Sequence, residues 1–327
     1  MEEPGLAEGT EIGLFIIRKR IQLYDISKDF ECTMINAEGN AQTNLNHPYL
    51  IRPLNDQNHL IENPTLADGT EIGLFIIGPL TYHSEISEIY VCTLINEETK
   101  GIAKLIKNSH SSEINAEGNA LTNLNHPYLI SPLDIQKLEN DDVIFFFKNF
   151  VEGDLEQVIS DRFNDPQITY QQEDIINWEA FLARFFYLIA EGLSYMHNSG
   201  FVHNKILPEN ILLHVKERKD GSYYYFPVII DFVESAQIDP NDSSTNTQKD
   251  VLFYGLTLFY CMTGFIPYSL DPKILQRCLD FLQKKGISNS FSDFICGVLT
   301  QRPSFDELIN HSWFNEFYPE EERELDN

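Results

Sequence analysis

The sequence predicts an α+β fold in which strands dominate the first half of the chain and helices the second half. Three observations carry this prediction. The chain has 327 residues, of which 43% are apolar, so it can bury one or two large cores. Residues 143–147 form a short apolar run of the kind found in strands. Residues 178–198 instead place apolar side chains at helical spacing, which indicates a long amphipathic helix.

The remaining elements follow in chain order. Residues 211–215 and 227–230 are short strand-like runs, and an Asp-Gly pair between them favours a hairpin turn. Residues 251–263 are apolar on every face, which predicts a helix buried within a large core. Residues 303–314 begin with Pro-Ser and carry acidic residues in their first turn, which predicts the start of a last helix.

The chain is strongly acidic. Its 50 acidic and 23 basic residues give a net charge of −27, and a surface of this sign repels nucleic acid and acidic membranes. We therefore expect neither as a partner. The five cysteines form no CxxC pair, which favours free thiols in a reducing compartment. The N-terminus lacks the apolar core of a signal peptide, so we expect a soluble, cytoplasmic protein.

Two stretches of the chain occur twice. Residues 6–17 return with one substitution as residues 66–77, and residues 35–51 return with one substitution as residues 114–130. The spacing differs between the copies, because the first copy lacks a counterpart of residues 95–113. Two unequal copies are too few for a solenoid of stacked repeats, so we interpret the first copy as a partial duplicate.

The block that the first copy lacks contains Lys104. Without that block the first copy has no lysine to pair with its own Glu38. A sheet without its central strand leaves backbone groups unpaired and buries too little apolar surface to offset the entropy of ordering. We therefore expect residues 1–65 to form a loosely packed appendage, locally helical around residues 35–45, with no core of its own.

The order of motifs over residues 70–317 resembles the protein kinase family. The resemblance implies a bilobal fold, with a small antiparallel β lobe that contains one main helix and a larger, mostly helical lobe. We expect the small lobe and hinge at residues 66–150, the large lobe at residues 151–317 and an acidic tail at residues 318–327. The matching stretches are IYVCTLINEETKGIAK (89–104), EGNALTNLNHPYLI (117–130), FKNFVEGDL (147–155), HNKILPEN (203–210), DFV (231–233), DVLFYGLTLFYCMTGFIPY (250–268) and QRPSFDELINHSWF (301–314).

The same resemblance implies a site for ATP and Mg²⁺. In this family a lysine holds the nucleotide phosphates, a glutamate pairs with that lysine, and an asparagine and an aspartate bind the metal. The residues at the matching positions are Lys104, its partner Glu117, the gatekeeper Phe147, the hinge residues Asn149 and Phe150, and the two metal ligands Asn210 and Asp231.

The sequence departs from the family at the residue that carries the proton chemistry. Lys205 stands where the family has the aspartate that orients and deprotonates the substrate hydroxyl. A lysine side chain is cationic at neutral pH and cannot accept that proton. The three glycines of the phosphate-binding loop are replaced by Tyr82, Ser84 and Ser87. Side chains at these positions obstruct the close approach of backbone N–H groups to phosphates.

The segment after Asp231 departs as well. Val233 replaces the glycine of the metal-binding motif, and only 18 residues lie between Asp231 and Asp250, which matches the buried acid that anchors the catalytic loop. The family's Ala-Pro-Glu motif, which supports the peptide substrate, does not occur in this stretch. Residues 234–249 are polar and rich in turn formers, so we expect a flexible loop there.

These departures predict a pseudokinase rather than an active enzyme. We expect a scaffold or allosteric binding module that has protein partners and binds ATP and Mg²⁺ weakly or not at all. Two alternatives stay open. One is an atypical ATP-dependent protein serine/threonine kinase that uses a different base, and the other is a decaying duplicate without a function.

Overall fold

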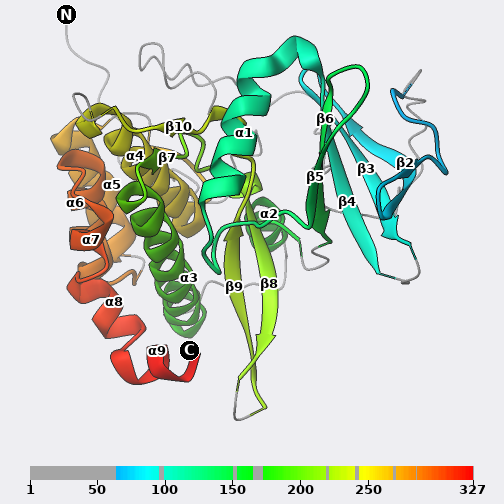
Figure 1. Cartoon of the computed structure of the whole chain (residues 1–327). Coiled ribbons are helices and arrows are strands. Elements are labelled where there is room, and N and C mark those ends of the chain that lie inside the picture. The colour runs from blue at the N-terminus through cyan, green and yellow to red at the C-terminus, as the bar shows by residue number, and fades with distance from the viewer. Residues whose placement is uncertain are drawn as a thin grey trace, which may run out of the picture.

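The computed structural model has two lobes, a small one built on a sheet and a larger one built mainly of helices (Figure 1). This arrangement confirms the α+β, bilobal fold that the sequence predicts. Nearly all of the first repeat copy lies outside the residues that the structure describes, as does Phe150. The described residues are 64–95, 99–149, 153–164, 172–218, 221–239, 243–267, 270–284 and 286–326.

The small lobe is a six-stranded antiparallel sheet with the strand order β1-β2-β3-β4-β6-β5. One helix, α1 (Ser111–Asn123), stands between this sheet and the large lobe (Figure 1). The strands are β1 (Glu71–Ile72), β2 (Phe75–His83), β3 (Ser87–Leu94), β4 (Lys100–Ile106), β5 (Asp134–Lys137) and β6 (Val143–Lys148).

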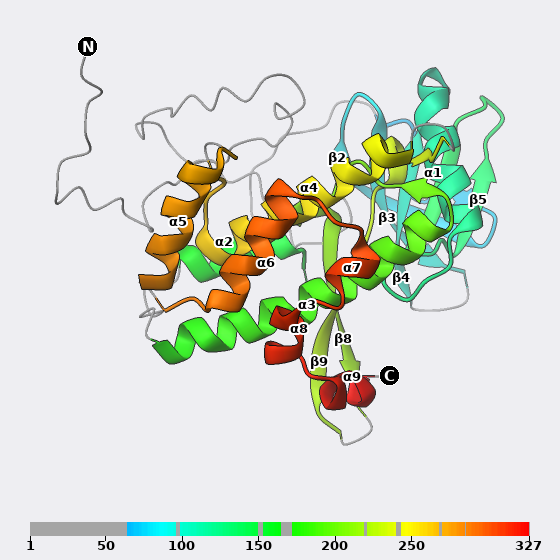
Figure 2. The same ribbon diagram turned by 90° about the vertical axis from the view of Figure 1, so that its left-hand side faces the viewer.

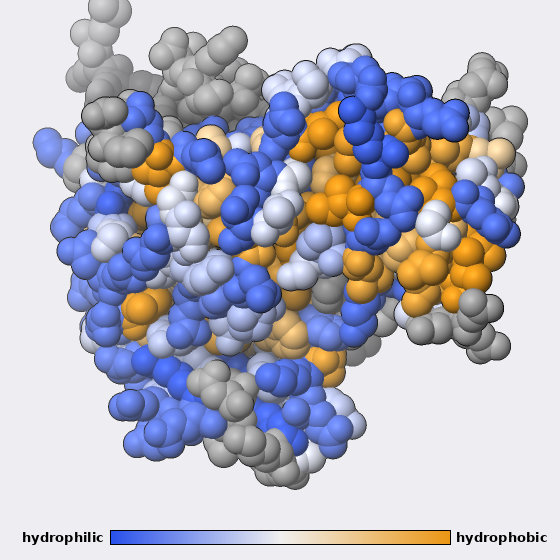
Figure 3. Space-filling view, in the orientation of Figure 1, coloured by the Kyte–Doolittle hydropathy of each residue, from blue (hydrophilic) through white to orange (hydrophobic). Residues whose placement is uncertain are grey.

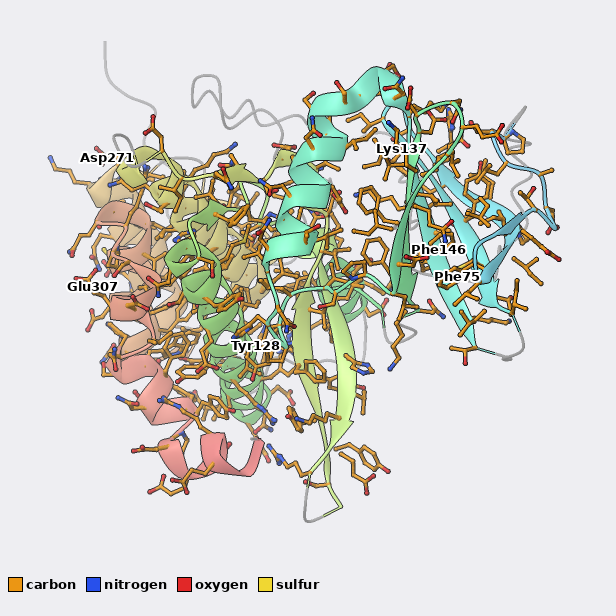
Figure 4. All side chains as sticks on the ribbon, viewed as in Figure 1. Phe75, Tyr128, Lys137, Phe146, Asp271 and Glu307 are labelled. Atoms are coloured by element: carbon orange, nitrogen blue, oxygen red, sulfur yellow. The ribbon has the colours of Figure 1, made fainter. Side chains whose placement is uncertain are left out.

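Alternation along β4 gives the sheet two different faces. Leu105 belongs to a cluster on one face, where the rings of Phe75 and Phe146 stack with their centroids 3.9 Å apart (Figure 4). Ile106 belongs to the main core on the opposite face. Side chains two residues apart on a strand share a face, so Lys104 points the same way as Ile106. β4 thereby carries the lysine toward α1.

The large lobe contains one long helix, α3 (Gln172–Asn198), and the shorter helices lie beside it in Figure 2. No helix in the described part of the chain is both long and apolar enough to span a membrane. The other elements are α2 (Leu155–Asn164), β7 (Phe201–Val202), η3 (Pro208–Asn210), β8 (Ile211–Glu217), β9 (Tyr223–Ile229), η4 (Phe232–Glu234), β10 (Ala236–Gln237), α4 (Ser243–Thr263), α5 (Pro272–Lys284), α6 (Asn289–Thr300), α7 (Phe305–Leu308), α8 (Ser312–Phe317) and α9 (Glu320–Asp326).

Helix α3 confirms the amphipathic pattern over residues 178–198 and begins earlier, at Gln172. Its apolar side chains fall on one stripe, which is buried against the rest of the lobe. The predicted hairpin is also present, because β8 and β9 pair antiparallel with Ile211 opposite Ile229. This hairpin leads into Asn210 on one side and Asp231 on the other.

One local prediction is wrong. The expected flexible loop over residues 234–249 contains the short strand β10, which pairs with β7, and α4 begins at Ser243. Polar residues such as serine and threonine start helices as readily as they form turns, and the apolar helix that follows propagates backward through them. The predicted start of the last helix is confirmed, because α7 begins in a capping box formed by Ser304 and Glu307, and α8 follows as a separate helix.

Candidate functional site

Lys104 lies at the centre of a buried ionic site between the lobes. Its Nζ is 2.9 Å from Oε2 of Glu117 and 2.8 Å from Oδ1 of Asp231. The Lys104 side chain is only 3% exposed. Glu117 shares the inward face of α1 with Ala120 and Leu121, so the pattern that buries this helix also aims the carboxylate at β4.

A second lysine completes the site from the large lobe. Nζ of Lys205 is 3.0 Å from Oδ2 of Asp231 and 3.7 Å from Oε1 of Glu234. Each oxygen of the Asp231 carboxylate therefore faces one ammonium group. We call Lys104, Glu117, Lys205 and Asp231 the lysine–carboxylate cluster, in which two positive and two negative charges balance.

The two carboxylates of the cluster respond differently to their surroundings. Burial alone would raise the pKa of Asp231, but the adjacent Lys104 and Lys205 outweigh it and hold that pKa well below its usual range. Burial raises the pKa of Glu117, and its single hydrogen bond to Lys104 does not offset this. Oε1 of Glu117 is buried without a hydrogen-bond partner in the described structure. Asp231 is thus the firmly ionised member of the pair.

The loop that bears Lys205 is fixed by Asp250, a fully buried carboxylate. Its oxygens accept from the backbone N–H groups of His203, at 2.8 Å, and Asn204, at 2.6 Å. The His203 ring contacts the carbonyl of Ile230 through Nε2 at 3.0 Å and accepts from the N–H of Lys205 through Nδ1 at 3.2 Å. Burial lowers the pKa of His203, which agrees with a neutral ring that donates at one nitrogen and accepts at the other.

Asp231 is presented by an unusual backbone turn. Its φ of 69° lies in the left-handed region, and the short helix η4 follows directly. The hydroxyl of Ser235 donates to the carbonyl of Ala116 at 3.1 Å, which ties this turn to α1. Val233 lies within η4, so the residue that needs a left-handed conformation here is Asp231 and not the one that replaces the family's glycine.

The residues expected to bind Mg²⁺ are brought together but do not fit that ion. Both oxygens of Asp231 already contact ammonium groups. Asn210 is 3% exposed, and its Nδ2 donates to the carbonyl of Lys205 at 3.1 Å, so only its Oδ1 could bind a metal ion. Mg²⁺ takes oxygen ligands in octahedral geometry at about 2.1 Å, and a divalent ion on Asp231 would meet the positive charge of Lys205. The described residues contain no group of three or more His, Cys, Asp or Glu side chains that could hold a metal ion.

The hairpin between β2 and β3 stands where the family has its glycine-rich loop. In this hairpin the N–H of Ser84 donates to the carbonyl of Ser87 at 2.9 Å. The N–H of Ser87 donates to Oγ of Ser84 at 3.0 Å. These two N–H groups are committed within the turn, so they do not present the open row of donors that binds phosphates.

The strand that leads to the hinge offers one feature that fits a nucleotide base. Phe147 is fully buried at the position opposite Ile102 on β4. Asn149 follows β6, and its Oδ1 is buried without a hydrogen-bond partner in the described structure. An unpaired buried acceptor is costly, and an N–H donor from a ligand would relieve that cost.

A separate pocket of about 490 Å³ lies between α1 and the β5–β6 edge of the sheet. It is lined by apolar side chains that include Ile114, Ile135 and Phe145, together with polar residues of α1. Figure 3 shows apolar side chains gathered on the small lobe. No member of the lysine–carboxylate cluster lines this pocket, so it is a different site from the one that the family resemblance implies.

Comparison with known proteins identifies the class of protein that this fold and site define. The sequence profile of the protein kinase domain matches residues 83–254, just over half of the chain. The chain belongs to the protein kinase family. Over 97 residues it is 36% identical to cyclin-dependent kinase F-3 of Oryza sativa subsp. japonica, which covers 30% of this chain and 19% of that protein.

A longer match comes from Dictyostelium discoideum. The chain is 28% identical over 251 residues to the probable serine/threonine-protein kinase fhkB, covering 65% of this chain and 20% of that protein. It is 26% identical over 161 residues to the serine/threonine-protein kinase pim-2 of Danio rerio, covering 42% of this chain and 49% of that protein. The chain thus spans about a fifth of the length of the rice and fhkB proteins.

Proposed function

We propose that this chain is a catalytically impaired kinase domain, a pseudokinase, that acts as a scaffold or allosteric binding module. One observation carries the proposal. Lys205 stands at the position of the catalytic base, and its ammonium group contacts Asp231 at 3.0 Å. A cation held by a carboxylate cannot take a proton from a substrate hydroxyl, and loss of a positioned base costs on the order of 10²–10⁴ in rate.

Two further features support impaired transfer. The backbone N–H groups of Ser84 and Ser87 form hydrogen bonds within their own hairpin. They are therefore poorly placed to bind phosphates. Eleven residues separate Asp231 from the start of α4 at Ser243, which leaves little chain for a peptide-binding platform. We infer that any ATP binding is weak and that Asn149 is its contact at the hinge.

We infer the class of partner from the net charge of the chain. With a net charge of −27 the chain would bind proteins rather than nucleic acid or acidic membranes. The free cysteines among the described residues, Cys92, Cys261, Cys278 and Cys296, support a location in the reducing cytoplasm.

The test is transfer of labelled phosphate from ATP to a generic acceptor protein by the full chain and by Lys205→Asp. We expect neither protein to exceed the background without enzyme, because the hairpin and the short segment after Asp231 remain defective in the variant. Asp231→Ala supplies the control for contaminating kinases. Transfer by the wild type that Asp231→Ala abolishes would show an atypical serine/threonine kinase instead.

A further inference from the structure

Lys205 occupies the side of Asp231 that the family leaves to a metal ion. Its ammonium contacts Oδ2 of Asp231 at 3.0 Å, while Lys104 contacts Oδ1 at 2.8 Å. We infer that the Lys205 ammonium group replaces the divalent cation, so that this site binds the phosphates of a nucleoside triphosphate without Mg²⁺. The inference rests on the proposed function, because it concerns the residual nucleotide binding of an impaired kinase domain.

The backbone of Lys205 is held in place on both sides. Its N–H donates to Nδ1 of His203, and its carbonyl accepts from the N–H of Leu207 at 3.0 Å and from Nδ2 of Asn210 at 3.1 Å. His203 and Asn204 are in turn anchored on Asp250. The ammonium group is therefore tethered next to Asp231 and loses little freedom when it binds a ligand, unlike an ion taken from solution.

Lys205 is also the lysine that a ligand can reach. Its side chain is 15% exposed, compared with 3% for Lys104. An ammonium group has three N–H donors, so Lys205 can keep one on Asp231 and offer another to a phosphate oxygen. Glu234, at 3.7 Å, is 42% exposed and can give way to the phosphate.

A divalent ion would have to displace this arrangement. Because the lysine–carboxylate cluster is already neutral, Mg²⁺ at Asp231 would add two positive charges beside two ammonium groups. Removing the Lys205 charge should therefore do two things together: weaken metal-free binding and permit metal-assisted binding.

The experiment is calorimetric titration of the full chain with ATP, once in EDTA and once in excess Mg²⁺. We expect the wild type to bind ATP in EDTA at least as tightly as in Mg²⁺. Lys205→Gln should weaken binding in EDTA by about tenfold or more, since a charge-assisted hydrogen bond is lost, and should bind more tightly when Mg²⁺ is added. Lys205→Arg keeps the cation and should still bind in EDTA.

Lys137→Gln is the matched control, because Lys137 is an exposed lysine on β5 that pairs with Asp141 (Figure 4). It should leave both affinities unchanged. The melting temperature without ligand reports whether each variant folds. If Lys205→Gln does not fold, the ratio of affinities in EDTA and Mg²⁺ for wild type and Lys205→Arg decides the question.

Three results would overturn the inference: no ATP binding in either buffer, binding that requires Mg²⁺ in the wild type, or binding in EDTA that a folded Lys205→Gln leaves unchanged. None of them bears on the proposed function, which fails only if the wild type transfers phosphate.

Discussion

Glu88, on β3, is a buried carboxylate that holds the small lobe together. It is 1% exposed and accepts from the backbone N–H of Thr65 at 3.0 Å and its hydroxyl at 2.9 Å. Lys107 contacts it at 3.0 Å, and the hydroxyl of Tyr90 donates to it. Burial alone would raise the pKa of Glu88, but these partners together lower it to about 2.

The stability of the chain should therefore depend on pH through Glu88. The pKa is lower in the folded state, so this stabilisation is complete above the ordinary value of 4.5 and is lost as the pH falls toward 2. We expect Glu88→Gln to lower the free energy of unfolding by about 2–3 kcal/mol at pH 7 and by much less near pH 3. Urea unfolding at both pH values measures this. Glu85→Gln, exposed in the same β2–β3 hairpin, should change neither value, and an equal loss for Glu88→Gln at both pH values would exclude the ionic explanation.

Most of helix α1 lies in the stretch of sequence that is repeated most closely in the chain. Residues 35–51 and 114–130 differ only at one position, where the first copy has Gln42 and the second has Leu121. Leu121 is 5% exposed and belongs to the main core. A glutamine at this position would bury an amide among apolar side chains, which is costly without partners. We infer that this one residue helps to explain why the second copy, and not the first, packs into the core of the small lobe.

Leu121→Gln tests that selection directly. We expect the free energy of unfolding to fall by about 2–4 kcal/mol, from lost apolar burial and an unsatisfied amide. Thr122→Gln, on the exposed side of the same helix, should change it by less than about 0.5 kcal/mol. Denaturant unfolding of both variants compares the two positions. Equal stability of Leu121→Gln and the wild type would mean that the core position does not discriminate between the copies.

Elements with a strong periodic pattern could be predicted from the sequence, whereas the start of α4 could not. The stripe on α3 and the β8–β9 hairpin follow from spacing alone. The start of α4 at Ser243 does not, because the polar residues that precede its apolar part favour turns and helix starts alike.

The residues of the candidate site could be predicted from the sequence, but their geometry could not. Sequence order identified Lys104, Glu117, Lys205 and Asp231, but their mutual distances depend on how β4, α1 and η4 meet. The hydrogen bond between the Ser87 N–H and Ser84 Oγ could not be predicted, because the sequence showed only that the glycines were lost. The unpaired Oδ1 of Asn149 depends on tertiary packing that no local pattern encodes.

At the scale of the whole molecule, the boundary of the first copy needs adjustment. The sequence places it after residue 65, but Thr65 donates twice to Glu88, and the N–H of Leu66 donates to the hydroxyl of Tyr90 at 3.1 Å. Thr65 is thus part of the small lobe. Residues 1–63 are the part whose role as an appendage stays a prediction.

Two truncations separate the appendage from the lobe. Deleting residues 1–63 should leave the melting temperature within about 2 °C of the full chain, because the contacts of Thr65 are kept. Deleting residues 1–65 should lower it further, because two hydrogen bonds to the buried Glu88 carboxylate are lost. Calorimetry of both proteins measures the difference. Failure of the shorter deletion to fold would make the first copy an integral part of the lobe.

We propose that this domain retains the kinase architecture and has lost its proton chemistry at Lys205. The most direct measurement is the number of phosphates added to the full chain itself, read by intact-mass spectrometry after prolonged incubation with ATP and Mg²⁺. We expect a mass unchanged from that of the untreated protein. One or more added phosphates in the wild type, and none in Asp231→Ala, would contradict it.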